Sequence, residues 1–481
     1  MRTSSHTLRR GLVAGLCALL LLIAGGAWAA DRPPQAAIAG AHPLATDAGF
    51  EVLAAGGNAF DAAVAVSAAL AVVEPYSSGL GGGGFWLLHR AADGRERMLD
   101  GRERAPLAAR PDMYLDANGR FVPELALNGP LAAGIPGEPA ALAHLAEQYG
   151  RLSLVQSLAP AIRLAHTGFI VDEHYRRFAE QRLAVLRQSP AAAEQFLRDG
   201  AAPPTGARIL QPDLAATLER LAAAGREGFY TGRTAELLVA GVRAAGGIWT
   251  LEDLASYRVV ERAPIISYYR GRRVVSAAPP SSGGVLLAQM LNMLARFDLA
   301  GSGADRAHLL VETMRRAYRD RALYLGDPDT VEVPVERLTH PFYAAGLARD
   351  IDPDRATPSL PAATAARSQG MDTTHLSILD REGNRVAATL SINYTFGSGF
   401  VPPGTGVLLN DEMDDFSAQP GAPNLYGLVG GEANAIAPGK RMLSSMTPTF
   451  VESERGVAIL DTPGGSRIIT MVLDVGFRMI T

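Results

Sequence analysis

The sequence predicts a mixed fold of helices and antiparallel strands, and three observations support this prediction. Apolar residues recur at helical spacing through three long stretches, 138–168, 212–246 and 285–324. Alternating apolar residues on both sides of a polar turn predict a β-hairpin over 373–392. The chain has 481 residues, 48% hydrophobic and 20% charged, which is the balance of a globular protein with a large core or two domains.

The N-terminal residues have the features of an export signal. Arg9 and Arg10 precede a long uncharged run, and Ala27-Trp28-Ala29 is a small-x-small motif just before a cleavage site at Ala30. We therefore predict a signal peptide over residues 1–29 and a periplasmic or secreted mature chain. An uncleaved anchor is the alternative, because the run is long enough to span a bilayer. The single cysteine, Cys17, lies within this signal, so the mature chain has no disulfide.

The first mature segment predicts two helices followed by a glycine-rich turn and a strand pair. Apolar faces within 44–73 are interrupted by Gly56–Gly57, which separates the two helices. Four glycines, Gly81–Gly84, then precede a buried strand at 85–88 and a return strand at 98–100. A phosphate-binding loop would need a following Lys-Ser/Thr pair and a helix, so close backbone packing is the preferred interpretation.

Composition and motifs argue against several classes of function. The net charge is −4 and the arginines are dispersed, which argues against a nucleic-acid partner. Nine histidines show no metal-ligand spacing, and neither HExxH nor Gly-x-Ser-x-Gly occurs. We therefore expect no metal, no cofactor, no serine–histidine triad and, after signal cleavage, no membrane association.

A threonine opens the predicted hairpin, and its position suggests chemistry. The Thr373 hydroxyl is a poor nucleophile unless a base lies beside it. Cleavage of the chain just before Thr373 would supply its own α-amino group as that base. The polar segment 352–370 that precedes it is rich in Ala, Ser and Pro and predicts an accessible loop. The alternative is that Thr373 only begins a strand, where β-branched residues are common.

Four further sequence features offer groups that could bind a charged substrate. The acidic cluster 410–415 lacks the ligand spacing of a calcium loop, which leaves a solvated turn or a pocket for an ammonium group. Arg102 could clamp a carboxylate with two parallel hydrogen bonds, and Ser444–Ser445 offers two hydroxyls. Adjacent N–H groups at Gly464–Gly465 could converge on one oxyanion, although a plain tight turn has the same sequence.

Nine motifs in order along the mature chain resemble the γ-glutamyltranspeptidase (glutathione hydrolase) family. These motifs are Gly56–Ala63, Gly79–Phe85, Gly134–Gly137, Pro279–Gly284, Tyr324–Pro328, Thr373–His375, Met413–Phe416, Leu443–Met446 and Pro463–Arg467. The resemblance implies an α+β fold, the four-layer αββα sandwich of N-terminal-nucleophile hydrolases. The chain ends at Thr481, whereas family members continue beyond the last motif, so we expect the sandwich to lack its C-terminal elements.

The resemblance also implies roles for individual residues. Thr373 matches the nucleophile that is freed when the precursor cleaves itself between Asp372 and Thr373, and Ser391 matches a hydroxyl residue beside it. Gly464 and Gly465 match the oxyanion hole. The α-amino group of the donor is assigned to three residues, Asn393, Glu412 and Asp415. Its α-carboxylate is assigned to three others, Arg102, Ser444 and Ser445. Tyr426 lies in the segment that matches the lid loop, 420–431.

The function implied by the resemblance is γ-glutamyl transfer from glutathione and related compounds to water, amino acids or peptides. The precursor would yield a large subunit, 30–372, and a small subunit, 373–481, which remain partners. The physics of the motifs agrees, because a γ-glutamyl group carries an ammonium and a carboxylate that need acidic residues and an arginine. Two alternatives stay open: an acylase that cleaves glutaryl-cephalosporins, and an unprocessed, inactive pseudoenzyme.

Overall fold

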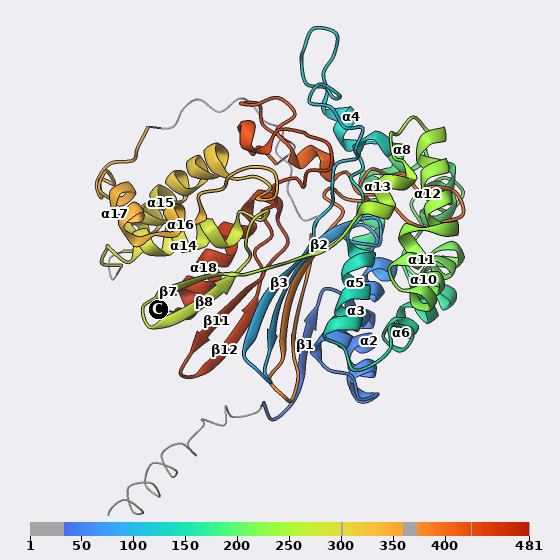
Figure 1. Ribbon diagram of the computed structural model, residues 1–481, viewed down its shortest axis with the longest axis horizontal. Helices are drawn as coiled ribbons and strands as arrows, with labels where there is room; N and C mark the ends of the chain where they lie inside the picture. The colour runs from blue at the N-terminus through green and yellow to red at the C-terminus, as the bar shows by residue number, and fades with distance from the viewer. Residues whose placement is uncertain (1–32, 300–301, 359–372, 425, 481) are drawn as a thin grey trace, which may run out of the picture.

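Two antiparallel β-sheets stack face to face, and helices cover the outer face of each sheet (Figure 1). This computed structural model describes residues 33–299, 302–358, 373–424 and 426–480. The predicted signal peptide and Asp372 lie outside the described residues. The four-layer αββα arrangement expected from the sequence is confirmed by the layers and by the solved structures discussed below.

The sheets differ in size. The larger sheet has the order β1 (Ala37–Gly40), β9 (Thr373–Leu379), β10 (Arg385–Ser391), β2 (Gly83–Arg90), β3 (Arg95–Gly101) and β6 (Val260–Arg262). The smaller sheet has the order β12 (Gly456–Leu460), β11 (Thr449–Ser453), β8 (Arg272–Ser276) and β7 (Ile265–Tyr269). A separate short pair consists of β4 (Phe169–Ile170) and β5 (Arg208–Ile209).

Helices of the larger layer pack outside the larger sheet. They are α2 (Pro43–Ala54), α3 (Ala59–Val73), α5 (Glu138–Gln148), α6 (Leu154–Thr167), α10 (Pro212–Ala224), α11 (Glu227–Tyr230), α12 (Gly232–Ala244) and α13 (Leu251–Ser256). The opposite layer contains α14 (Gly283–Leu294), α15 (Gly303–Tyr324), α16 (Val335–Thr339), α17 (Pro341–Ala348) and α18 (Ile468–Ile480). The remaining helices are α4 (Pro123–Leu127), α7 (Glu173–Gln181), α8 (Leu183–Leu186), α9 (Pro190–Phe196) and the 3₁₀ turns η1 (Pro130–Ala132), η2 (Glu412–Asp415), η3 (Glu432–Asn434) and η4 (Gly465–Arg467).

The predicted helices form, although the long stretches are divided. The predicted pair over 44–73 is confirmed, and Asn58 explains the second start because its side chain caps α3 in a capping box with Asp61. The stretch 212–246 contains three helices, and each of the other two long stretches contains two. Among the described residues, every helix is too short or too polar to traverse a bilayer.

Apolar side chains form a core on each face of the larger sheet. Trp86 and Leu88 of β2 pack with α3 in one cluster, whereas Phe85 and Leu87 belong to the cluster between the sheets and the α14 layer. Successive side chains of a strand point to opposite faces, so a strand buried on both faces has a continuous apolar run. This explains why β2 lacks the alternation of a half-exposed strand.

The hairpin register places a hydroxyl beside Thr373. Strands β9 and β10 pair with Thr373 opposite Ser391, and α3 packs against both strands on the other face. Leu376 and Ile378 belong to the cluster that faces α3, so Thr373 points away from that layer, toward the space between the sheets. The hairpin prediction over 373–392 is confirmed.

The glycine run Gly81–Gly84 permits close backbone contact. A Cβ at Gly81 would overlap the carbonyl oxygen of Leu408, and a Cβ at Gly82 would overlap that of Ser391. The loop that leads to the acidic turn η2 can therefore lie directly against the start of β2. The predicted packing role of these glycines is confirmed.

Candidate active site

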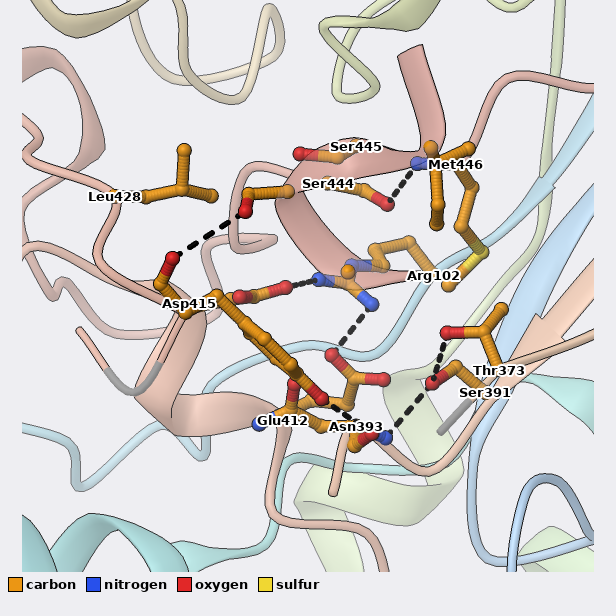
Figure 2. A pocket seen from close by; sticks show the side chains of 14 residues that line it. Arg102, Thr373, Ser391, Asn393, Glu412, Asp415, Leu428, Ser444, Ser445 and Met446 are labelled. Atoms are coloured by element: carbon orange, nitrogen blue, oxygen red, sulfur yellow. Dashed lines mark hydrogen bonds and ion pairs between the residues drawn. The ribbon is translucent and has the colours of Figure 1, made fainter. Parts of the chain in front are cut away.

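A pocket opens where the end of β3, the β9–β10 hairpin and the turns η2 and η4 meet (Figure 2). Its lining residues are Arg102, Thr373, Ser391, Asn393, Glu412, Asp415, Tyr426, Leu428, Ser444, Ser445, Met446, Gly465, Ser466 and Ile468. The fold thus brings together nearly all of the site residues proposed from sequence, which lie far apart along the chain. Gly464 does not line the pocket, and Asp372 lies outside the described residues.

One end of the pocket carries neutral hydroxyl groups. Thr373 Oγ1 lies 3.5 Å from Ser391 Oγ, and the Asn393 N–H donates to Ser391 Oγ at 2.8 Å. Thr373 is only 6% exposed. Asn393 adopts a left-handed backbone conformation, with φ of 71°, which asparagine tolerates better than most residues. The turn after β10 therefore holds Ser391 and Thr373 side by side.

A glycine turn forms the adjacent wall. Gly465 has φ of 54° and begins η4, and a Cβ there would lie 2.6 Å from the Tyr426 ring. The Tyr426 hydroxyl donates to the Asn393 carbonyl at 2.9 Å, which holds the predicted lid segment over this turn. Only glycine satisfies both the backbone conformation and the contact with the ring.

The other end of the pocket is charged. The buried Arg102 donates to Glu412 Oε2 at 2.7 Å and to Asp415 Oδ2 at 2.5 Å, and its Nε donates to the Met442 carbonyl at 3.2 Å. The sequence assigned the arginine and the acids to opposite charges of one ligand. In the structure they also pair with each other, so the pocket holds a preformed cluster of both signs.

Asn410 anchors the acidic turn to the glycine run. Its Nδ2 donates to the carbonyl oxygens of Gly81 and Gly134 at 2.6 and 2.8 Å. Its Oδ1 accepts from the Glu412 N–H at 3.0 Å. The acidic cluster is therefore not the solvated turn that the sequence left open, because Asn410 and Glu412 are buried in the site.

Burial changes the acidity of Glu412. Burial raises the pKa of Glu412 to about 7, against the opposing effect of the Arg102 guanidinium, and the nearby Asp415 raises the pKa further. Glu412 Oε1 accepts no hydrogen bond from the described residues. This oxygen can accept from an ammonium group without breaking the contact between Oε2 and Arg102.

Two residues of α15 that the sequence did not single out support the site. The Tyr318 hydroxyl donates to the Ser466 carbonyl at 2.5 Å, and Arg321 donates to Ser445 Oγ at 3.3 Å. Positions three apart share one helix face. The buried face of α15 includes Glu312, Arg316 and Arg321, and charged residues at core-facing positions were the signal that could have revealed this role.

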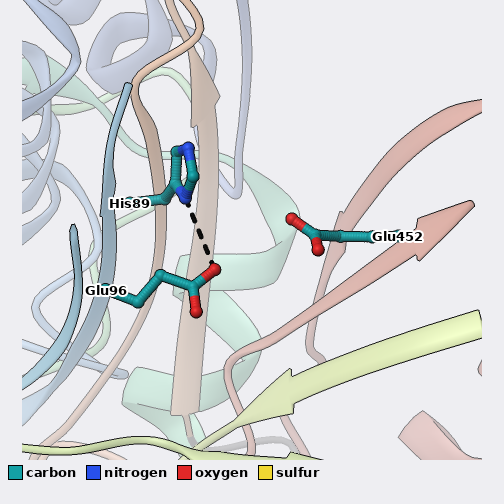
Figure 3. A group of neighbouring side chains, drawn as sticks. All are labelled: His89, Glu96 and Glu452. Carbon is teal, nitrogen blue, oxygen red and sulfur yellow. Dashed lines mark hydrogen bonds and ion pairs between the residues drawn. The ribbon is translucent and has the colours of Figure 1, made fainter. Parts of the chain in front are cut away.

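A second cluster of side chains, outside the pocket, has residue types that could bind a metal (Figure 3). His89, Glu96 and Glu452 place one ligand atom each within 4.8 Å of the others. Arg273 Nη1 donates to Glu96 at 3.0 Å and to Glu452 at 2.8 Å, and Arg385 also pairs with Glu452. Because arginines already pair with both carboxylates, the cluster is an ion-pair network that links the two sheets.

Comparison with known families agrees with the motifs. The model of the gamma-glutamyltranspeptidase family matches residues 45–481. The chain belongs to this family. It is 44% identical to a glutathione hydrolase proenzyme of Pseudomonas sp. (strain A14), over 92% of this chain and 77% of that protein. It is 43% identical to the glutathione hydrolase proenzyme of Escherichia coli (strain K12), over 92% of this chain and 78% of that protein.

Solved structures show the same fold. The γ-glutamyltranspeptidase of Helicobacter pylori aligns with a TM-score of 0.65 and 42% identity, over 66% of this chain and 92% of that chain. A cephalosporin acylase from Bacillus halodurans aligns with a TM-score of 0.77 and 31% identity, over 92% of this chain and 81% of that chain. The proteins similar to this chain therefore include ones named glutathione hydrolase or γ-glutamyltranspeptidase and one named cephalosporin acylase.

Proposed function

We propose that this protein transfers γ-glutamyl groups from glutathione and related donors to water, amino acids or peptides through an acyl intermediate on Thr373. One observation carries the proposal. The pocket has a hydroxyl nucleophile at one end and both an arginine and two carboxylates at the other. A γ-glutamyl donor presents its scissile amide and its two charged groups in the same arrangement.

Each chemical step has a group in the site. After cleavage of the Asp372–Thr373 bond, the Thr373 amine accepts the hydroxyl proton while Oγ attacks the γ-amide carbon. The oxyanion is assigned to the N–H groups of the Gly464–Gly465 turn, of which Gly465 lines the pocket. The protonated amine then gives its proton to the leaving amine, and water or an acceptor amine attacks the ester to release the γ-glutamyl group.

The charged end favours this function over a glutaryl acylase. A glutaryl group has no α-amino group, so Glu412 Oε1 would face a methylene and gain no hydrogen bond from the donor, and two carboxylates would share the single positive charge of Arg102. Rates for γ-glutamyl-p-nitroanilide and glutaryl-p-nitroanilide, measured side by side on the mature protein, test the choice. We expect faster turnover of the γ-glutamyl donor. Faster turnover of the glutaryl donor would support the acylase instead.

Maturation is part of the proposal, with a large subunit 30–372 and a small subunit 373–481. Relatives named as proenzymes support a processed precursor. On a denaturing gel, the wild type should give two bands and Thr373→Ala one. Thr374→Ala is the matched control, because its side chain lies on the opposite face of β9 and should permit cleavage. A single band for all three proteins would support the inactive precursor.

We also propose that residues 1–29 direct export and that the mature enzyme is periplasmic or secreted. Support comes from the arginines before the uncharged run and the small residues at Ala27 and Ala29. Cell fractionation with N-terminal sequencing of the large subunit tests this. A mature protein that begins near Ala30 outside the cytoplasm is expected. A chain that keeps Met1 and stays in the cytoplasm would contradict it.

A further inference from the structure

We propose that Arg321 is a positioning residue for the donor's α-carboxylate, which orients Ser445 and adds a second positive charge behind the serine pair. This inference rests on the proposed γ-glutamyl function and deepens it. Arg321 lies near the end of α15 and is 4% exposed. Its Nε donates to Ser282 Oγ at 3.0 Å and its Nη2 to Ser445 Oγ at 3.3 Å.

The direction of these hydrogen bonds determines where the serine hydrogens point. Arginine only donates, so Ser282 and Ser445 both accept from it. Ser282 uses its single hydrogen to donate to the Ser444 carbonyl at 2.7 Å. The Ser445 hydroxyl is thereby left with its hydrogen for a different acceptor, and this residue lines the pocket.

A backbone hydrogen bond orients the Ser444 hydroxyl in the same way. Its Oγ accepts from the Met446 N–H at 3.1 Å, as Figure 2 shows, which leaves its own hydrogen to donate. The Ser282 N–H also donates to the Ser444 carbonyl, at 2.9 Å. Two hydroxyl donors side by side suit a carboxylate, which accepts hydrogen bonds through both oxygens.

The two buried arginines differ in whether a carboxylate neutralises their charge. Arg102 is paired with Glu412 and Asp415, whereas Arg321 forms no ion pair with a carboxylate among the described residues. Burial lowers the pKa of Arg321, which reflects the cost of an unpaired cation in the interior. A carboxylate bound at Ser444 and Ser445 would lie close to this cation and stabilise it.

The test compares two donors that differ only in the α-carboxylate. These are γ-glutamyl-p-nitroanilide and 4-aminobutyryl-p-nitroanilide, which keeps the amino group. For mature Arg321→Met we expect KM to rise about tenfold to a hundredfold with the γ-glutamyl donor. With the 4-aminobutyryl donor, KM should change less than about threefold, because the lost interaction involves the missing carboxylate. Arg321→Lys keeps the charge but not the fork and should fall between wild type and Arg321→Met.

The matched control is Arg316→Met on the same helix. Arg316 is a buried arginine whose Nη1 donates to Glu312 at 2.6 Å and whose Nε donates to the Leu347 carbonyl at 2.9 Å, and it does not line the pocket. It should lower the melting temperature but leave the ratio of the two KM values unchanged. An equal rise of KM for both donors in Arg321→Met would overturn the proposal and assign Arg321 a structural role.

Two outcomes need a second measurement. If Arg321→Met does not mature, Ser282→Ala and Arg321→Lys are compared with wild type for inhibition by L-glutamate and by 4-aminobutyrate. Weaker inhibition by L-glutamate but not by 4-aminobutyrate supports the proposal, and an equal loss of inhibition by both compounds overturns it. If the wild type prefers glutaryl donors, the γ-glutamyl function fails, but glutaryl and butyryl anilides then test Arg321 independently, because only the glutaryl group has a carboxylate.

Discussion

The two ends of the pocket are built on different principles. At the nucleophile end, Thr373, Ser391 and Gly465 are neutral, and they are positioned by a strand register and a tight turn. At the donor end, Arg102 and Glu412 are buried charges that pair with each other. The residues assigned to the reaction and those assigned to donor recognition therefore lie at opposite ends of the pocket. In the proposed mechanism the proton is transferred at the neutral end, whereas the ion pairs that recognise the donor lie at the charged end.

Of the variants considered, Arg102→Gln should lower kcat/KM the most, because it removes the positive charge at the donor end. Loss of one partner of a buried, hydrogen-bonded charge pair costs about 2–5 kcal/mol, roughly 30-fold to 4,000-fold in kcat/KM. We expect most of this loss in KM, because Arg102 contacts the distal groups of the donor. Arg262→Gln, which removes ion pairs to Asp100 and Asp329 outside the pocket, is the control. Unchanged kinetics in Arg102→Gln would refute the donor-end assignment.

Gly465→Ala should distort the turn at the nucleophile end and lower kcat. A Cβ 2.6 Å from the Tyr426 ring forces the turn or the lid to move, and losing one oxyanion donor costs about 10²–10³ in rate. Gly456→Ala is the control, because it also has positive φ but its Cβ would meet no atom within 4 Å. If both variants lose activity equally, backbone strain rather than the oxyanion geometry would be responsible.

The pH dependence should show a contribution from each end. The pKa of Glu412 is raised to about 7, so Glu412 loses its negative charge, and its attraction for the donor ammonium, as the pH falls through this value. The Thr373 amine, with an ordinary pKa of about 7.7–8.0, also becomes protonated as the pH falls and then cannot act as a base. The logarithm of kcat/KM should therefore approach a slope of about two below pH 7 in wild type and about one in Glu412→Gln. Identical slopes would show that Glu412 does not titrate in this range.

Ser391→Ala should have the smallest effect of these variants. The Thr373–Ser391 contact is long, at 3.5 Å, and a neutral hydrogen bond contributes about 0.5–1.5 kcal/mol, roughly twofold to tenfold in kcat. Ser391→Thr keeps the hydroxyl and should retain activity. The nearby hydroxyl also lowers the pKa of Glu412, so Ser391→Ala should move the acid limb to higher pH. A loss as large as that of Gly465→Ala would make Ser391 a direct participant in proton transfer.

Local patterns predicted the hairpin and the helices because each depends on neighbours in the chain. The Thr373 hairpin follows from alternation around a polar turn, and the two helices over 44–73 follow from the apolar faces on each side of Gly56–Gly57. The division of the longer helical stretches was less predictable, because packing between layers decides where each helix ends.

The sequence by itself determined which residue types the site contains, since the ordered motifs include the nucleophile, the acids, the arginine and the glycine turn. Only the tertiary structure decided how they pair. Arg102 meets Glu412 across 310 positions of the chain, and Arg321 meets Ser445 across 124. Such contacts depend on how the sheets and helices stack, and no local periodicity encodes that distance in space. The physical reason is that buried charges must find partners wherever the fold brings them together.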